Sequence, residues 1–139
     1  MGRWTSALVL LLAGVALAIQ GVRSDNSSNF VLCVGALVVA WWFSPLNGRG
    51  GPRHTEVESR PDDFPVVIYW RPGCVYCMRL RGALGKDKDR ATWISIWADE
   101  DAAAFVRSVN NGNETVPTVR VGETVRTNPD PAIIKTALR

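Results

Sequence analysis

Apolar residues dominate the first third of the chain, whereas the remainder mixes short apolar runs with polar residues. Two nearly continuous apolar runs cover about residues 4–22 and 30–46, and a polar segment separates them. A helix that crosses a bilayer needs about 20 apolar residues, which the first run approaches and the second approaches only with its flanks. Tryptophans mark the ends of the runs, as is typical of membrane interfaces. The pattern predicts a hairpin of two transmembrane helices within residues 1–46.

The basic residues around the two runs predict an orientation. Arg3 precedes the first run and Arg49 and Arg53 follow the second, whereas the loop between them carries Arg23 alone. Because basic flanks stay on the cytoplasmic side, we expect a multi-pass protein of the cell membrane with its C-terminal domain in the cytoplasm. The alternative is that the first run is a signal peptide cleaved near residues 16–18, in which case the second run still crosses the membrane.

Glycine, proline and dispersed charges characterise residues 47–63, which contain no apolar run. This composition is typical of a flexible tether. We therefore predict three parts: a membrane hairpin over residues 1–46, a flexible linker over residues 47–63 and a folded domain over residues 64–139.

Within the domain, the hydrophobic pattern predicts alternating strands and helices. Short β-branched and aromatic runs predict strands at Val66–Trp70, Thr92–Trp97, Val116–Val121 and Thr124–Thr127. Helical spacing predicts helices over residues 74–84 and about 99–109, and a last helix capped by Asn128 with Pro129 at its first position. The order β-α-β-α-β-β-α describes an α/β domain. Its first two strands should be parallel and its last two should form a hairpin.

Composition narrows the range of functions. The net charge of +3 is modest and no basic cluster is interleaved with aromatic residues, so we expect no nucleic-acid partner. Three cysteines argue against a secreted fold held by disulfides. Cys33 lies in the second apolar run, where the role of a small buried hydrophobic residue is expected.

The other two cysteines, Cys74 and Cys77, form a C-x-x-C pair directly after the strand Val66–Trp70. A helix that opens at Cys74 places its sulfur at the positive end of the helix dipole, where the thiolate is stabilised. Cys77 lies one turn later and is placed to attack a mixed disulfide formed on Cys74. The pair predicts thiol–disulfide exchange, with Cys74 as the nucleophile and Cys77 as the resolving thiol.

A zinc half-site is the structural alternative for this pair. Four-coordinate zinc needs two more ligands, but Cys33 belongs to the apolar run and His54 to the predicted linker. We predict redox chemistry and no bound metal.

Three segments of the domain resemble the glutaredoxin branch of the thioredoxin superfamily. They are Cys74-Val75-Tyr76-Cys77 after the first strand, Thr115-Val116-Pro117 before the third, and Thr127-Asn128-Pro129 before the last helix. The last segment stands where many glutaredoxins have a Gly-Gly pair. In this respect the chain is more similar to mycoredoxins, the relatives that serve mycothiol instead of glutathione. The resemblance implies a thioredoxin-like fold of the glutaredoxin type, preceded by the two predicted transmembrane helices.

The resemblance also implies roles for residues near the cysteines. Pro117 would be a cis proline facing them, which leaves the Val116 backbone free to pair with an extended substrate. Arg71 would bind a carboxylate of a thiol cofactor and favour the Cys74 thiolate, or would be a solvated turn residue. Tyr76 would pack on the substrate or simply line its helix.

Four further residues complete the implied thiol-binding set: Thr115, Thr127, Asn128 and Asp130. The last three have structural alternatives, since Asn128 also fits a helix cap and Asp130 a partner of the helix dipole.

The sequence thus predicts a membrane-anchored oxidoreductase that reduces mixed disulfides between proteins and a low-molecular-weight thiol, either mycothiol or glutathione. That thiol is a co-substrate, no cofactor is tightly bound, and an NADPH-linked disulfide reductase takes part indirectly. One alternative is a protein-disulfide redoxin that a flavoprotein reductase reduces directly. Two others are a metal-binding assembly module docked through the hairpin and an extracytoplasmic oxidant of reversed topology.

Overall fold

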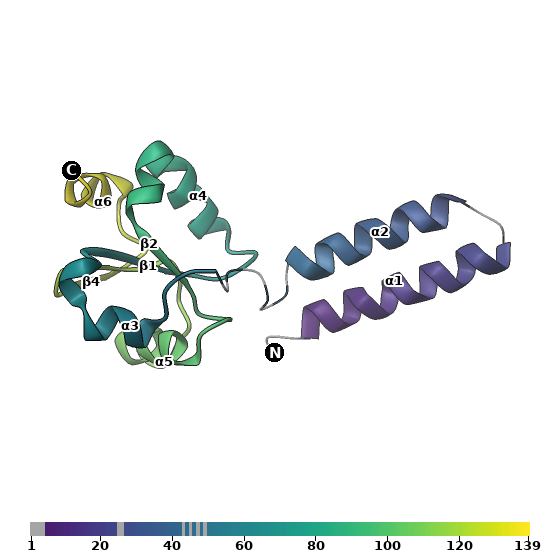
Figure 1. Cartoon of the computed structure of the whole chain (residues 1–139), viewed down its shortest axis with the longest axis horizontal. Helices are drawn as coiled ribbons and strands as arrows, with labels where there is room; N and C mark the ends of the chain where they lie inside the picture. The colour runs from purple at the N-terminus through teal and green to yellow at the C-terminus, as the bar shows by residue number, and fades with distance from the viewer. Residues whose placement is uncertain (1–4, 25–26, 43, 45, 47, 49) are drawn as a thin grey trace. The chain divides into compact units, whose positions relative to one another are not determined.

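The computed structural model describes residues 5–24, 27–42, 44, 46, 48 and 50–139 (Figure 1). The chain forms two compact units, residues 1–47 and residues 48–139. Arg3 and Arg49, on which the predicted orientation depends, lie outside the described residues.

The N-terminal unit contains two helices, α1 (Thr5–Ser24) and α2 (Ser27–Trp42), which pack along one another (Figure 1). Small residues bring the two helices together. A Cβ added at Gly14 would lie 3.6 Å from the Ala36 side chain, so the two backbones approach closely at this point. Helices are therefore present where the two apolar runs predict them.

The prediction that these helices span a membrane is corrected by the structure. Among the described residues, no helix has the length and apolar character that a membrane crossing requires. The 16 residues of α2 fall short of the about 20 that a span needs, and the last turn of α1 contains Arg23. This finding overturns the predicted pair of transmembrane helices and the multi-pass membrane localisation that was inferred from it.

The C-terminal unit is built on a four-stranded sheet of order β2-β1-β3-β4. Its strands are β1 (Val66–Trp70), β2 (Thr92–Ser95), β3 (Thr118–Val121) and β4 (Thr124–Thr127). β1 and β2 are parallel, whereas β3 pairs antiparallel with both β1 and β4. The predicted parallel pair and terminal hairpin are both confirmed, because a strand–helix–strand connection produces the first and the short turn at Gly122 the second.

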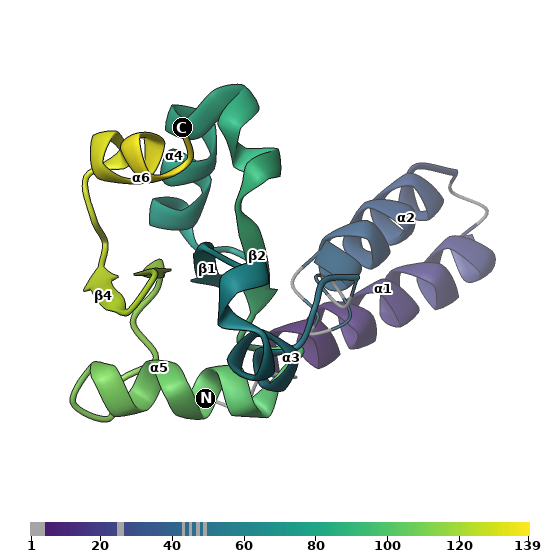
Figure 2. The same cartoon turned by 60° about the vertical axis from the view of Figure 1, so that its left-hand side comes forward.

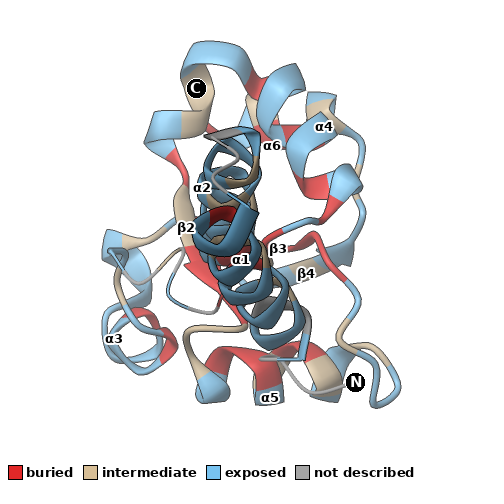
Figure 3. Ribbon diagram, turned by 90° about the vertical axis from the view of Figure 1, so that its right-hand side faces the viewer, coloured by how far each residue is buried: buried red, intermediate tan, exposed pale blue. Residues whose placement is uncertain are grey.

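Helices cover both faces of this sheet (Figures 1 and 2). α4 (Val75–Leu84) and α6 (Pro131–Ala137) lie on one face, and α3 (His54–Ser59) and α5 (Glu100–Val109) on the other. β1 is buried on both faces: Val66 and Ile68 point to the core under α4 and α6, and Val67 and Tyr69 to the core under α3 and α5. Figure 3 shows the resulting band of buried residues along the strands and on the inner sides of the helices.

The segment predicted as a flexible linker contains α3, followed by a short 3-10 turn at Pro61–Asp63. Val57 of α3 is fully buried in the core, and the His54 Nδ1 atom lies 2.9 Å from the hydroxyl of Tyr69. Arg120 of β3 also donates to Glu58 of the same helix over 2.8 Å. The folded unit therefore begins near residue 48 and not near residue 64.

Several predicted boundaries shift for local reasons. β2 stops at Ser95 because the Ser95 carbonyl accepts two turn N–H groups, from Ala98 and Asp99. β3 begins only at Thr118, since the preceding proline has no N–H to donate to a ladder. The cap of the last helix is Asp130, whose carboxylate accepts the Ala132 N–H at 2.8 Å, and not the predicted Asn128.

Residues 48–63 should contribute measurably to stability because Val57 is fully buried. We expect a fragment of residues 48–139 to be more stable than one of residues 64–139 by at least about 2 kcal/mol, the scale of burying one valine side chain. Urea unfolding followed by circular dichroism measures the difference. In the longer fragment, Val57→Ala should remove part of the added stability. Thr55→Ala, at an exposed position of the same helix, should leave the stability unchanged. Equal stability of the two fragments would contradict this assignment.

Tyr69 gives the domain an alkaline limit. Burial raises the pKa of Tyr69 above its usual value, Arg120 opposes this effect, and Glu58 and Asp99 add to it. Because the unfolded chain releases its phenolic proton first, at about pH 10, stability is complete below that pH and falls above it. Tyr69→Phe should flatten the decline in unfolding free energy between about pH 9.5 and 11. Tyr76→Phe, which alters the exposed tyrosine, should leave the decline in place.

Candidate active site

The C-x-x-C pair lies at the start of α4, directly after the turn that follows β1. The turn after Trp70 uses a left-handed Gly73, with φ of 74°, and the Cys74 N–H donates to the Arg71 carbonyl at 3.3 Å. Cys74 then becomes the N-cap of α4. A buried strand followed by a tight turn thus places this sulfur at the N-terminus of a ten-residue helix, as the sequence predicts.

The two sulfurs are joined in a disulfide, with the Cα atoms of Cys74 and Cys77 5.3 Å apart. The Cys77 N–H donates to the Cys74 sulfur at 3.1 Å. Cys74 is 9% exposed and Cys77 3%. Cys74 is therefore the sulfur that an incoming substrate can reach, and its charge is stabilised by the helix terminus when the disulfide is reduced.

A second segment, Thr115–Thr118, lies directly against the first cysteine. The Val116–Pro117 peptide bond is cis, which agrees with the expectation from the resemblance. The Val116 carbonyl oxygen lies 3.4 Å from the Cys74 sulfur. Val116 and Pro117 are buried and Thr115 is exposed, so the segment runs from the surface to the sulfur.

A third segment, residues 127–130, lies beside the second. The Asn128 N–H donates to the Pro117 carbonyl at 2.7 Å, and Asn128 adopts a left-handed conformation with φ of 47°. Thr127 and Asn128 are both exposed. Asp130 takes the capping role described above, so one of its carboxylate oxygens faces the backbone of α6.

Two predicted residues lie on the cysteine side of the site. Arg71 is half-buried and joins the turn through its carbonyl group, described above. Tyr76 is 57% exposed on the first turn of α4, and the Arg79 guanidinium lies 5.7 Å from the centre of its ring. This cation–π contact holds an aromatic surface beside Cys77.

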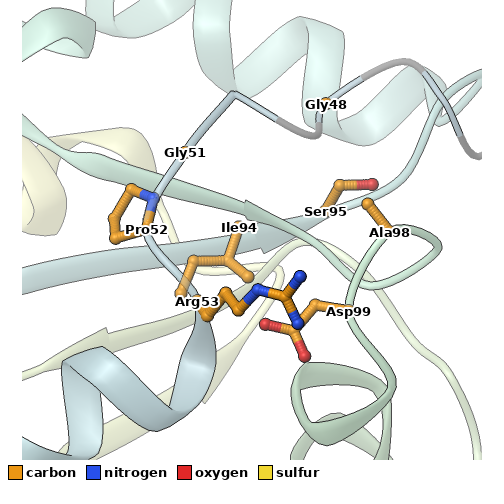
Figure 4. A pocket seen from close by; sticks show the side chains of 8 residues that line it. All are labelled: Gly48, Gly51, Pro52, Arg53, Ile94, Ser95, Ala98 and Asp99. Carbon is orange, nitrogen blue, oxygen red and sulfur yellow. The ribbon is translucent and has the colours of Figure 1, made fainter.

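Together these three segments can carry out thiol–disulfide exchange. They supply an accessible sulfur at a helix N-terminus, a second sulfur within bonding distance, and exposed polar residues along one side. Among the residues that the structure describes, no three His, Cys, Asp or Glu side chains gather as a metal site would require. A separate pocket of about 450 Å³ opens between residues 48–53 and 94–99 (Figure 4) and contains none of the predicted site residues.

Sequence reasoning missed one residue near the site, Asn110. The Asn110-Asn111-Gly112 run predicts only the end of a helix, and α5 does end there. The side chain of Asn110, however, hydrogen-bonds both Thr118 and Thr127. No sequence signal identifies these partners, because they are distant along the chain and are brought close by the sheet.

Comparisons with known proteins agree on the C-terminal unit. The family model described as Glutaredoxin matches residues 66–126. A Mycobacterium tuberculosis protein named as a glutaredoxin is 39% identical over 74 residues, which cover 52% of this chain and 88% of that protein. Mycoredoxin 1 of Corynebacterium glutamicum is 44% identical over 66 residues, which cover 46% of this chain and 80% of that protein.

The position of Cys74 at a helix N-terminus predicts selective alkylation of the reduced chain. At pH 6, iodoacetamide should modify Cys74 on the order of tenfold faster than Cys77, because the thiolate is the reactive form. Mass spectrometry of the digested protein locates the label. The fast reaction should survive Cys77→Ser and Cys33→Ser and disappear in Cys74→Ser. Equal labelling of the two thiols in the pair would contradict the assignment of Cys74 as the nucleophile.

Proposed function

Because the chain belongs to the glutaredoxin family, it is a thiol–disulfide oxidoreductase, and we propose that its substrates are mixed disulfides between proteins and a low-molecular-weight thiol. The observation that carries this proposal is the placement of the Cys74 sulfur. It caps α4 and lies 3.4 Å from the Val116 carbonyl oxygen, beside a segment that reaches the surface.

Each step of the proposed reaction is a thiol–disulfide exchange, in which one S–S bond breaks and one S–S bond forms. The Cys74 thiolate attacks the sulfur of the low-molecular-weight thiol in the mixed disulfide, and the substrate protein leaves as a thiolate that takes up a proton. A second thiol molecule then attacks the adduct on Cys74. This step releases the symmetric disulfide of the small thiol and regenerates the Cys74 thiolate. An NADPH-linked disulfide reductase returns the released disulfide to thiol.

Cys77 can also resolve the adduct between Cys74 and the small thiol. Its thiolate, one turn along α4, can attack the Cys74 sulfur and expel the small thiol, which leaves the Cys74–Cys77 disulfide. Reduction of that disulfide by two further thiol molecules restores the enzyme. In this scheme Cys74 is indispensable and Cys77 is not.

We assign binding of the small thiol to the exposed side of the site. Arg71 and Tyr76 border it from the cysteine turn, and Thr115 and Val116 offer a backbone edge. Thr127, Asn128 and Asp130 border it from the segment before α6. Mycothiol is the favoured thiol, since Thr127-Asn128-Pro129 departs from the Gly-Gly pair of many glutaredoxins and Mycoredoxin 1 is among the similar proteins.

A coupled assay tests this function. The full chain is given a mycothiolated or a glutathionylated protein, with the matching reductase and NADPH, and NADPH oxidation is followed. We expect turnover with the mycothiolated protein to exceed turnover with the glutathionylated one. Cys74→Ser should abolish turnover, and Cys77→Ser should retain a measurable part of it.

The outcomes separate the competing functions. Loss of turnover in both cysteine variants, with reduction of an ordinary protein disulfide by the wild type, would replace the proposal by a protein-disulfide redoxin reduced directly by a flavoprotein. Absence of turnover with either mixed disulfide would refute the proposal.

A further inference from the structure

Asn110, the C-cap of α5, uses its whole side-chain amide in hydrogen bonds. Its Nδ2 group donates to the Val106 carbonyl at 2.8 Å and to the Thr118 hydroxyl oxygen at 3.0 Å. Its Oδ1 atom accepts from the Thr127 hydroxyl at 2.5 Å. An amide that donates on one side and accepts on the other thus joins the end of α5 to β3 and to β4.

The donor side leads to the segment that contacts Cys74. Thr118 is fully buried, and its hydroxyl donates to the Thr115 carbonyl at 2.8 Å while accepting from Asn110. The hydroxyl therefore closes the turn that contains Val116 and Pro117. Because a hydroxyl has one proton to give, the Asn110 donor fixes the direction of this bond toward Thr115.

The acceptor side leads to the segment before α6. Thr127 is the last residue of β4, and the next residue, Asn128, donates its N–H to the Pro117 carbonyl at 2.7 Å. The strand register places Thr127 opposite Thr118. Asn110 thus bridges two residues that face each other across the strand pair, at the end where residues 115–118 lead into β3 and residues 127–130 follow β4.

We propose that Asn110 is a positioning residue that sets the spacing of residues 115–118 and 127–130, and thereby the affinity of the site for the small-thiol half of a mixed disulfide. This inference rests on the proposed function. Asn110 itself is assigned no contact with the substrate and no part in the chemistry at sulfur. Its removal should therefore weaken substrate binding and leave the rate of the chemical steps nearly unchanged.

Asparagine suits this position because of its mixed hydrogen-bonding capacity. Aspartate would keep the acceptor for Thr127 but lose both donors, and would leave the buried Thr118 hydroxyl oxygen without its partner. Alanine would lose all three bonds. The two replacements therefore rank the contributions of the donor and acceptor sides.

The control is Asn113, which belongs to the same turn. Its Nδ2 group donates to the Asn110 carbonyl at 3.2 Å, and it is exposed. Asn113→Ala removes one side-chain hydrogen bond from the end of α5 without touching β3 or β4. It reports the effect of loosening the turn alone.

Steady-state kinetics on the full chain test the proposal, with the mixed disulfide as the varied substrate. Asn110→Ala should raise KM about fivefold to tenfold, the effect expected for losing hydrogen bonds of this kind, with kcat changed less than twofold. Asn110→Asp should fall between Asn110→Ala and the wild type, and Asn113→Ala should match the wild type. An unchanged KM in Asn110→Ala would overturn the proposal. A fall in apparent kcat that follows a fall in the folded fraction, with KM unchanged, would also overturn it.

Thr127→Val provides a second route, because it removes one exposed hydroxyl and leaves α5 intact. If Thr127 acts through Asn110, the double variant Asn110→Ala with Thr127→Val should raise KM no further than Asn110→Ala alone. Multiplied KM effects would show that the Thr127 hydroxyl acts independently of Asn110 and would overturn the bridging role.

Amide hydrogen exchange keeps this inference separable from the proposed function. Asn110→Ala should accelerate exchange in residues 115–121 and 124–130 together, and Asn113→Ala in neither. If the wild type fails to turn over mixed disulfides, the proposed function fails and exchange alone decides the inference. Acceleration in only one of the two segments, or in neither, would overturn it.

Discussion

Strand β1 is the constraint on which the site depends, because it is paired on both edges and buried on both faces. Because β1 and β3 are antiparallel, the C-terminal end of β1 and the N-terminal end of β3 lie side by side at the same end of the sheet. The exit of β1 leads to Cys74, and the entry of β3 follows Pro117. Because Tyr69 lies opposite Thr118 in the strand register, the Cys74 sulfur lies close to the Val116 carbonyl, although the two residues are far apart along the chain.

The same strand explains why the segment before the sheet is part of the fold. Tyr69 points to the α3 and α5 face and carries a hydroxyl that must be satisfied inside the core. The His54 Nδ1 atom supplies the partner at 2.9 Å, and the backbone N–H of His54 donates to the Asp99 carboxylate at 2.8 Å. The Tyr69 hydroxyl is thus paired with the first residue of α3, and the backbone of that residue is held by the cap of α5. The docking of α3 follows from this requirement together with the burial of Val57.

Sequence reasoning succeeded where the signal is local and failed where it is tertiary. Strand β1 and the Cys74 helix follow from periodicity and from the chemistry of one short segment, and both are where they were predicted. α3 has six residues with only Val57 as a large apolar side chain, so its composition resembles a linker. Its stability comes from partners on β1 and β3. Asn110 was missed for the same reason, since a helix-ending asparagine and a bridging asparagine have the same sequence signature.

The backbone at Asn128 adopts a conformation that glycine favours, although the chain departs here from the Gly-Gly pair of many glutaredoxins. With φ of 47°, Asn128 occupies the left-handed region that glycine adopts freely and that asparagine tolerates better than most residues. Its N–H can therefore still reach the Pro117 carbonyl at 2.7 Å. What changes is the surface: an exposed amide and the Thr127 methyl group stand where glycines would leave the backbone bare. In the proposed function, the departure keeps the turn and alters the side chains that face the bound thiol, so it changes the selectivity among thiols and preserves the approach to Cys74.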